Sequence, residues 1–89
     1  MLETNAWAGG YELDLVVRRG RRVLFVEVKS KDGERFGHPL EAVDARKWGR
    51  IHVAAEAWLA RHPELAELEL RFEVAALRAG RLQRFAATV

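Results

Sequence analysis

Two short acidic patterns stand on either side of a glycine-centred arginine cluster. Glu12 and Asp14 are two residues apart before Gly20, and Glu27 and Lys29 are two residues apart after it. In a β-strand, side chains two residues apart project from the same face. Paired carboxylates hold a hard cation such as Mg²⁺ and leave positions for water and a phosphate oxygen. The pattern therefore predicts metal-dependent phosphodiester hydrolysis, in which the cation polarises the phosphoryl group.

Each residue of this cluster has a definite role in that hypothesis. Asp14 and Glu27 are the expected ligands of Mg²⁺ or Mn²⁺, with the main-chain carbonyl of Val28 as a third. Lys29 is expected to orient the attacking water or to offset charge that develops on the phosphate. The alternative is a solvated face on which acids and a lysine form cross-strand pairs, as alternating strands often do.

The elements that position the cluster form a hairpin. Residues 11–17 and 23–29 are predicted strands, and Gly20 supplies the positive φ that a tight turn between them requires. Counting back from Gly20 places Asp14 close to Glu27. Strict alternation then predicts two faces for the first strand. One carries Tyr11, Leu13, Leu15 and Val17, and the other carries Glu12, Asp14 and Val16.

The second strand favours a site over a solvated face. Val23 and Phe25 share the face of Glu27 and Lys29, so these charges continue an apolar surface. A charge on a core face costs several kcal/mol unless it is paired or bound to a metal. This arrangement is typical of a functional site at the end of a sheet.

One main helix and three further strands complete the expected fold. Asp44 is the predicted N-cap of a helix that runs to about residue 60, and Pro63 fixes its end. Residues 2–7 form a short first strand, and residues 68–77 and 82–87 form a second hairpin. The order β-β-β-α-β-β predicts an α/β fold with a mixed β-sheet and one helix on one face. At 89 residues, the chain has room for a single domain, 1–89.

Composition narrows the partners and the compartment. The chain has no cysteine, no apolar run that could span a membrane and no basic, apolar N-terminal segment, so we expect a cytoplasmic protein. The net charge is only +2, but arginines cluster at 18–22, and Arg46, Lys47 and Arg50 lie close together. Such clusters neutralise nucleic-acid phosphates. The alternative is that turn tips and exposed helix faces are simply charged.

Three segments carry a family resemblance. They are Tyr11–Leu15, with its Glu-x-Asp; Phe25–Lys31, with Glu27-Val28-Lys29; and Arg35–Lys47, with Phe36-Gly37-His38-Pro39. In this order they resemble the YraN family, a branch of the restriction-endonuclease-like PD-(D/E)xK superfamily similar in fold to archaeal Holliday-junction resolvases. The resemblance extends from about residue 5 to the C-terminus.

The resemblance implies a function and a set of site residues. Asp14, Glu27 and Lys29 would be the catalytic acid, acid and lysine, with Glu12 as an accessory carboxylate. The substrate would be DNA, branched or single-stranded. Arg46 and Lys47, which lie in the matching segment, would contact it together with Arg50 of the same basic cluster. The alternatives are a non-catalytic nucleic-acid-binding module and an oligomerising interaction domain.

The sequence departs from this family at its N-terminus. Relatives usually begin with a helix that brings a further glutamate to the site, whereas here the chain starts at about the first strand. We therefore expect an N-terminally truncated restriction-endonuclease-like core. The sheet face left open should demand a partner, and we expect a homodimer that buries it. Tyr11 also stands where the family commonly has a glycine.

Overall fold

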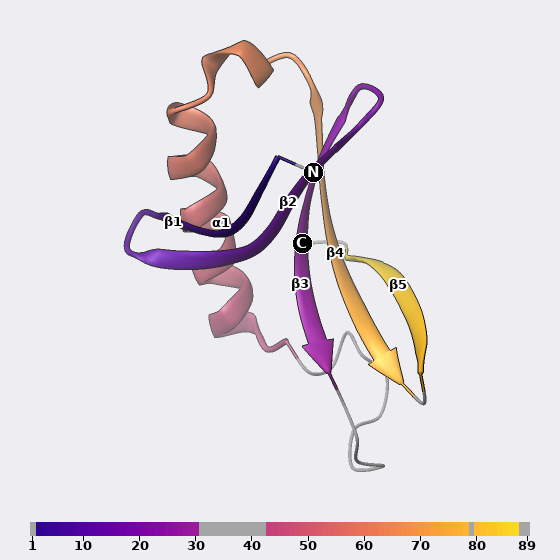
Figure 1. The fold of residues 1–89 in the computed structure, drawn as a ribbon. Coiled ribbons are helices and arrows are strands. Elements are labelled where there is room, and N and C mark those ends of the chain that lie inside the picture. Colours follow the sequence, from indigo (N-terminus) through magenta and orange to yellow (C-terminus); the bar gives the residue numbers. More distant parts are fainter. Residues whose placement is uncertain (1, 31–42, 79, 88–89) are drawn as a thin grey trace.

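Five strands and one long helix make up the described part of the chain. The computed structural model describes residues 2–30, 43–78 and 80–87 (Figure 1). The elements are β1 (Glu3–Ala8), β2 (Tyr11–Arg19), β3 (Arg22–Ser30), α1 (Ala45–Ala60), a 3₁₀ turn (Pro63–Leu65), β4 (Glu69–Arg78) and β5 (Arg81–Ala87). The predicted order β-β-β-α-β-β is confirmed. The segment that contains Phe36, Gly37 and His38 lies outside the described residues.

The sheet is mixed, as predicted. Its strands lie in the order β1-β2-β3-β4-β5, and every neighbouring pair is antiparallel except β3 and β4. A parallel pair requires a crossover connection, and α1 lies in the crossover between β3 and β4 (Figure 1). Gly20 has a φ of 60° at the tip of the β2–β3 hairpin, which confirms the turn.

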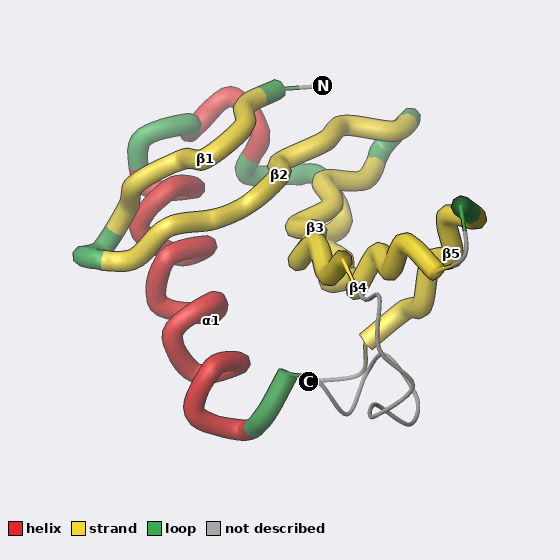
Figure 2. Tube along the Cα trace, turned by 60° about the horizontal axis from the view of Figure 1, so that its bottom comes forward, coloured by secondary structure: helices red, strands yellow, loops and turns green. Residues whose placement is uncertain are grey.

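The helix begins and packs as its sequence dictates. The Asp44 carboxylate accepts a hydrogen bond from the Lys47 backbone N–H at 2.8 Å, which confirms the predicted N-cap. Helix α1 lies against β1 and β2 on one face of the sheet (Figure 2). The largest fully buried side chains form the centre of this core: Trp58, Phe25, Val16, Val23 and Val74.

Strand β2 does not alternate as predicted. Leu13 and Val16 are both buried in the core under α1, although they are three residues apart. The two strands β1 and β2 pair at Thr4–Leu15 and again at Ala6–Leu13, so Asn5 and Asp14 fall between paired positions. Asn5 has a φ of 50°, a left-handed conformation that asparagine tolerates better than most residues. The local break turns Leu13 inward, and the prediction of strict alternation was wrong at this point.

The opposite face of the sheet is apolar. Leu24, Val26 and Ala75 form a second cluster there, with Leu15 and Val17 packed against it. Within the described residues no helix lies on this face (Figure 2). A hollow of about 280 Å³ opens onto it, between Leu82, which is 65% exposed, and the arginines 19 and 84. We call this surface the far face.

The homodimer stays a prediction, and the far face makes it testable. Leu82→Glu should convert a dimer to a monomer in sedimentation velocity, because it places a charge on the face that the dimer would bury. Leu82 is so exposed in the single chain that the substitution should not unfold it. The control is Val53→Glu, at an exposed apolar position on α1. A wild-type chain that stays monomeric at millimolar concentration would contradict the dimer.

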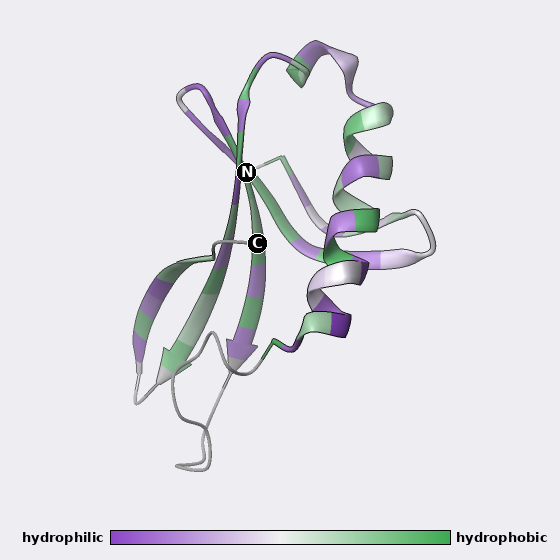
Figure 3. Ribbon diagram, turned by 180° about the vertical axis from the view of Figure 1, so that it is seen from behind, coloured by the Kyte–Doolittle hydropathy of each residue, from purple (hydrophilic) through white to green (hydrophobic). Residues whose placement is uncertain are grey.

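The hydropathy of the residues agrees with an exposed β2–β3 hairpin tip and a helix α1 that packs on the sheet with one face. The tip of the β2–β3 hairpin is hydrophilic, and hydrophilic and hydrophobic residues alternate around α1 (Figure 3). In the described part of the chain, no helix is long and apolar enough to cross a membrane.

Candidate active site

The site forms where β2 leaves β3. The pairing of these two strands runs from Arg19–Arg22 to Leu15–Val26 and goes no further, although β2 continues along β1 to Tyr11. Figure 2 shows the β1–β2 hairpin turning away from β3 and lying along α1. Asp14 and Glu27, which were predicted to lie near each other, therefore lie on the two sides of a gap between diverging strands, just beyond the last β2–β3 pair.

Asp14 lies in this gap in place of the missing strand pairing. Its Oδ2 accepts a hydrogen bond from the backbone N–H of Val28 at 2.9 Å. In a β-strand, the N–H and C=O of one residue point toward the same neighbouring strand. The carbonyl of Val28 therefore leaves β3 on the side of Asp14. The side chain of Val28 is exposed, and only its main chain belongs to the site.

Glu27 is the buried member of the acidic pair. It is 6% exposed, the only buried charged residue among those that the structure describes. Burial raises the pKa of the Glu27 carboxyl, and the nearby charge of Asp14 raises it further. Two ammonium groups act in the opposite direction: Nζ of Lys47 is 3.2 Å and Nζ of Lys29 is 3.8 Å from Oε1 of Glu27. The predicted grouping of Asp14, Glu27 and Lys29 is present in the fold.

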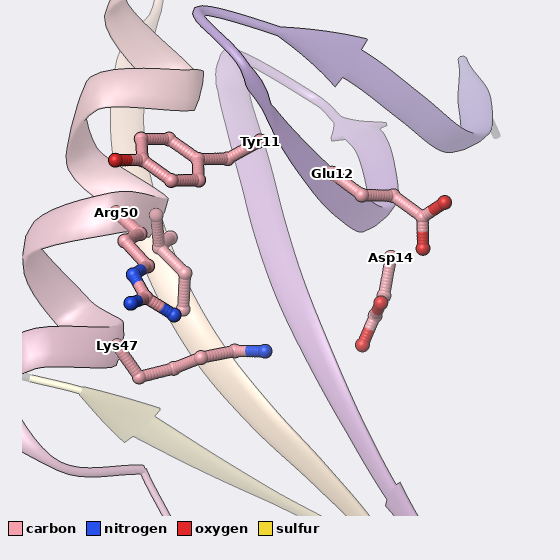
Figure 4. A pocket seen from close by; sticks show the side chains of 6 residues that line it. Tyr11, Glu12, Asp14, Lys47 and Arg50 are labelled. Carbon is pink, nitrogen blue, oxygen red and sulfur yellow. The ribbon is translucent and has the colours of Figure 1, made fainter.

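Helix α1 closes the other side of the gap. A pocket of about 140 Å³ opens there, lined by Tyr11, Glu12, Asp14, Lys47, Arg50 and Ile51. Figure 4 shows Tyr11 reaching from β2 to the helix, and Lys47 extending from the helix toward the side on which Asp14 lies. The guanidinium of Arg50 lies 5.8 Å from the centroid of the Tyr11 ring. We call this space the Asp14 pocket.

The donor set fits a divalent cation in part. Asp14, Glu27 and the Val28 carbonyl offer oxygen atoms along one gap, and the charge of Asp14 raises the pKa of Glu27, an effect that a bound cation would relieve. Across the described residues, no three His, Asp or Glu side chains gather closely enough to hold a metal. Mg²⁺ commonly binds proteins through one or two carboxylates and takes its other ligands from water and substrate phosphate. Glu12 lines the pocket beside Asp14, and its role as accessory carboxylate stays a prediction.

The predicted nucleic-acid contacts separate in the structure. Lys47 and Arg50 line the Asp14 pocket, and Lys47 also pairs with Glu27. Arg46 is exposed near the start of α1 and does not line the pocket. Two pocket residues, Tyr11 and Ile51, were not predicted. Tyr11 could have been found from the sequence, because it is an aromatic residue beside the acidic pattern. Ile51 could not, because in the sequence it is an ordinary core residue of the helix.

A glutamate at the other end of the first strand is engaged elsewhere. Oε1 of Glu3 accepts a hydrogen bond from the indole Nε1 of Trp58 at 2.9 Å. Trp58 lies near the C-terminal end of α1, whereas the Asp14 pocket lies against its N-terminal half. Glu3 therefore fastens the helix to β1.

Comparison with known proteins points to one family. The model of the uncharacterised protein family UPF0102 matches residues 1–77. A UPF0102 protein of Methylorubrum extorquens (strain PA1) is 52% identical over 64 residues, covering 72% of this chain and 48% of the relative. A UPF0102 protein of Xanthomonas oryzae pv. oryzae (strain PXO99A) is 46% identical over 70 residues, covering 79% and 57%. One of Frankia casuarinae is 49% identical over 63 residues, covering 71% and 52%. The chain spans about half the length of the curated relatives it matches.

Proposed function

We propose that this chain, which belongs to the uncharacterised protein family UPF0102, is a metal-dependent nuclease that hydrolyses phosphodiester bonds in DNA. Its membership of the family confirms the resemblance to the YraN family. The family has a restriction-endonuclease-like fold, and the mixed sheet of the chain fits it. One observation carries the proposal: a buried carboxylate, Glu27, lies beside a second acid at the point where two strands diverge. The pKa of Glu27 is raised although Lys47 and Lys29 lie beside it, so the two ammonium groups do not fully offset the buried acidic pair and a further cation would stabilise it.

Each residue of the site has a proposed role that follows from its position. Asp14, Glu27 and the Val28 carbonyl would hold Mg²⁺ or Mn²⁺, which when bound polarises the phosphoryl group and lowers the pKa of a bound water. Asp14 is held in place by the backbone N–H of Val28. Lys29 lies at the edge of the gap with its ammonium toward Glu27, where it can orient a water or offset charge on the phosphate. In the reaction, the water gives up a proton and its oxygen bonds to phosphorus. The bond from phosphorus to one sugar oxygen breaks, and that oxygen takes up a proton to become a hydroxyl.

The first half of α1 supplies cations for the DNA backbone. Arg46 and Arg50 are exposed, and Lys47 extends into the gap. Each phosphate that a protein neutralises steepens the salt dependence of binding. Loss of Arg50 should therefore weaken binding of every sequence alike and flatten the salt slope. A cytoplasmic location, which the sequence predicts, would place the chain where such DNA is found.

A cleavage assay tests the proposal. The panel contains single-stranded, duplex, flap and four-way-junction DNA, each with Mg²⁺, Mn²⁺ or EDTA. We expect cutting of at least one substrate with either metal, none with EDTA, and a loss of at least about 100-fold in Lys29→Met, the scale on which removal of one electrostatic group lowers enzymatic rates. Lys29→Met keeps the length of the apolar stem, so its melting temperature serves as the folding control.

Two outcomes separate the alternatives. Salt-sensitive DNA binding without cleavage would replace the enzyme with a nucleic-acid-binding module. That reading is favoured by one observation: among the described residues, no third carboxylate or histidine lies close enough to Asp14 and Glu27 to share a metal with them. A stable oligomer with neither binding nor cleavage would leave an interaction domain built on the far face.

A further inference from the structure

The Asp14 pocket has an aromatic wall that metal binding and phosphate contact do not use. Tyr11 is 40% exposed although it lies at the first position of β2, between the buried Ala8 of β1 and the helix. Its ring lines the same pocket as Asp14 and Lys47 (Figure 4). A ring that is fixed by a strand and left partly open presents a flat apolar surface to whatever enters the pocket.

Arg50 adds a second planar group next to this ring. Its guanidinium lies 5.8 Å from the ring centroid, within the range of a cation–π contact. The Arg50 side chain is exposed, so a rotamer change that moves its guanidinium from the ring to a phosphate costs little. Aromatic rings and arginine planes are the groups on which proteins stack unpaired bases, whatever the base.

The size of the pocket limits what can enter. Its volume of about 140 Å³ is well below the roughly 300 Å³ at which pockets for drug-sized ligands begin. A single planar ring system fits this space, whereas a base pair does not. A base inside a duplex is stacked on both faces, so it has no free face to offer the Tyr11 ring.

We propose that Tyr11 and Arg50 form a stacking subsite for one unpaired base, beside the nucleotide whose phosphate would lie at the cation that Asp14 and Glu27 hold. The proposal rests on the nuclease function and narrows its substrate to DNA with unpaired nucleotides at the cutting position, such as a single strand or a flap. The subsite is indifferent to base identity, because every base has a stacking face.

Fluorescence anisotropy of labelled oligonucleotides tests the subsite. All proteins carry Lys29→Met, which makes cleavage slow but keeps both acids that would hold a cation, and Mg²⁺ is present. Tyr11→Ala should weaken binding of a single strand about tenfold, as loss of one base–aromatic stack does, and should leave binding of a blunt duplex of the same sequence unchanged. Tyr11→Phe should bind the single strand like the parent. Val53→Ala, at an exposed apolar position on the same helix as Arg50, is the matched control and should change neither.

A probe without one base separates stacking from a folding effect. Single strands with one abasic position, moved stepwise along the sequence, should reveal one position at which the parent loses about tenfold. In Tyr11→Ala, the same abasic position should cost nothing further, because the stack is already absent. Equal losses on single strand and duplex, or an abasic effect that persists in Tyr11→Ala, would overturn the subsite. A parent that binds neither DNA would overturn the nuclease function together with it.

Discussion

Glu27→Gln should lower DNA cleavage by at least about 100-fold and at the same time raise the melting temperature at pH 7.5. Cleavage falls because glutamine keeps the shape of the side chain but loses the charge that would hold the cation. Stability rises because the native carboxylate is 6% exposed and lies near the charge of Asp14. Loss of activity with a gain of stability is the signature of a residue retained for function.

The sign of the stability change follows from the pKa. Burial and Asp14 raise the pKa of Glu27 in the folded chain above the ordinary glutamate value of 4.5. The unfolded chain therefore releases this proton first as the pH rises. The stabilisation that the protonated group gives is complete below the unfolded pKa and is lost as the pH rises through the folded pKa. Glutamine does not titrate, so its advantage should be largest at neutral pH and should vanish near pH 4.

Thermal unfolding followed by circular dichroism measures this difference. A gain of about 1 kcal/mol corresponds to roughly 4–8 °C for a domain of this size. Glu69→Gln is the matched control, since Glu69 is exposed and pairs with Arg22 and Arg71 far from the gap. Exposed pairs contribute about 1 kcal/mol at most, so the control should keep full activity and lose little stability. A melting temperature that falls in Glu27→Gln at pH 7.5, or cleavage that survives it, would remove Glu27 from the proposed role.

The hairpin explains why the centre of the site could be predicted. A turn glycine fixes the register of the two strands that flank it, and in this chain Gly20 has the expected positive φ. Side chains at even spacing then share a face, which is why Glu27 and Lys29 lie together. These are local rules, and each depends on fewer than twenty neighbouring residues.

The rest of the site depends on a break in strand pairing and on contacts between residues far apart in the sequence, which local rules do not predict. The break at Asn5 and Asp14 ends the pairing of β2 with β3, and no glycine or proline marks it in the sequence. The pairing of Lys47 with Glu27 joins residues 20 apart, through the packing of α1 on the sheet. Tyr11 enters the pocket for the same reason, because the diverging end of β2 follows the helix.

Trp58→Ala should cost about 3–5 kcal/mol of unfolding free energy, the usual range for a buried tryptophan. Trp58 is 1% exposed. Its ring meets Phe25 edge to face with centroids 5.9 Å apart and stacks on His62 at 3.8 Å. Since small domains have only about 5–15 kcal/mol in total, this one change should leave the chain marginally folded in urea titrations at 25 °C.

Two further variants separate the contributions to this loss of unfolding free energy and relate it to DNA binding. Trp58→Phe keeps an apolar ring but loses the hydrogen bond to Glu3, so we expect a smaller cost, with about 1 kcal/mol from the hydrogen bond. Trp7→Ala, at a tryptophan that is 64% exposed, should lie within about 0.5 kcal/mol of wild type. Because α1 also carries Lys47 and Arg50, the Trp58 variants should lose single-strand binding in the order in which they lose stability. If Trp58→Ala were as stable as Trp7→Ala, then the packing of α1 on the sheet would not be what holds the Asp14 pocket together.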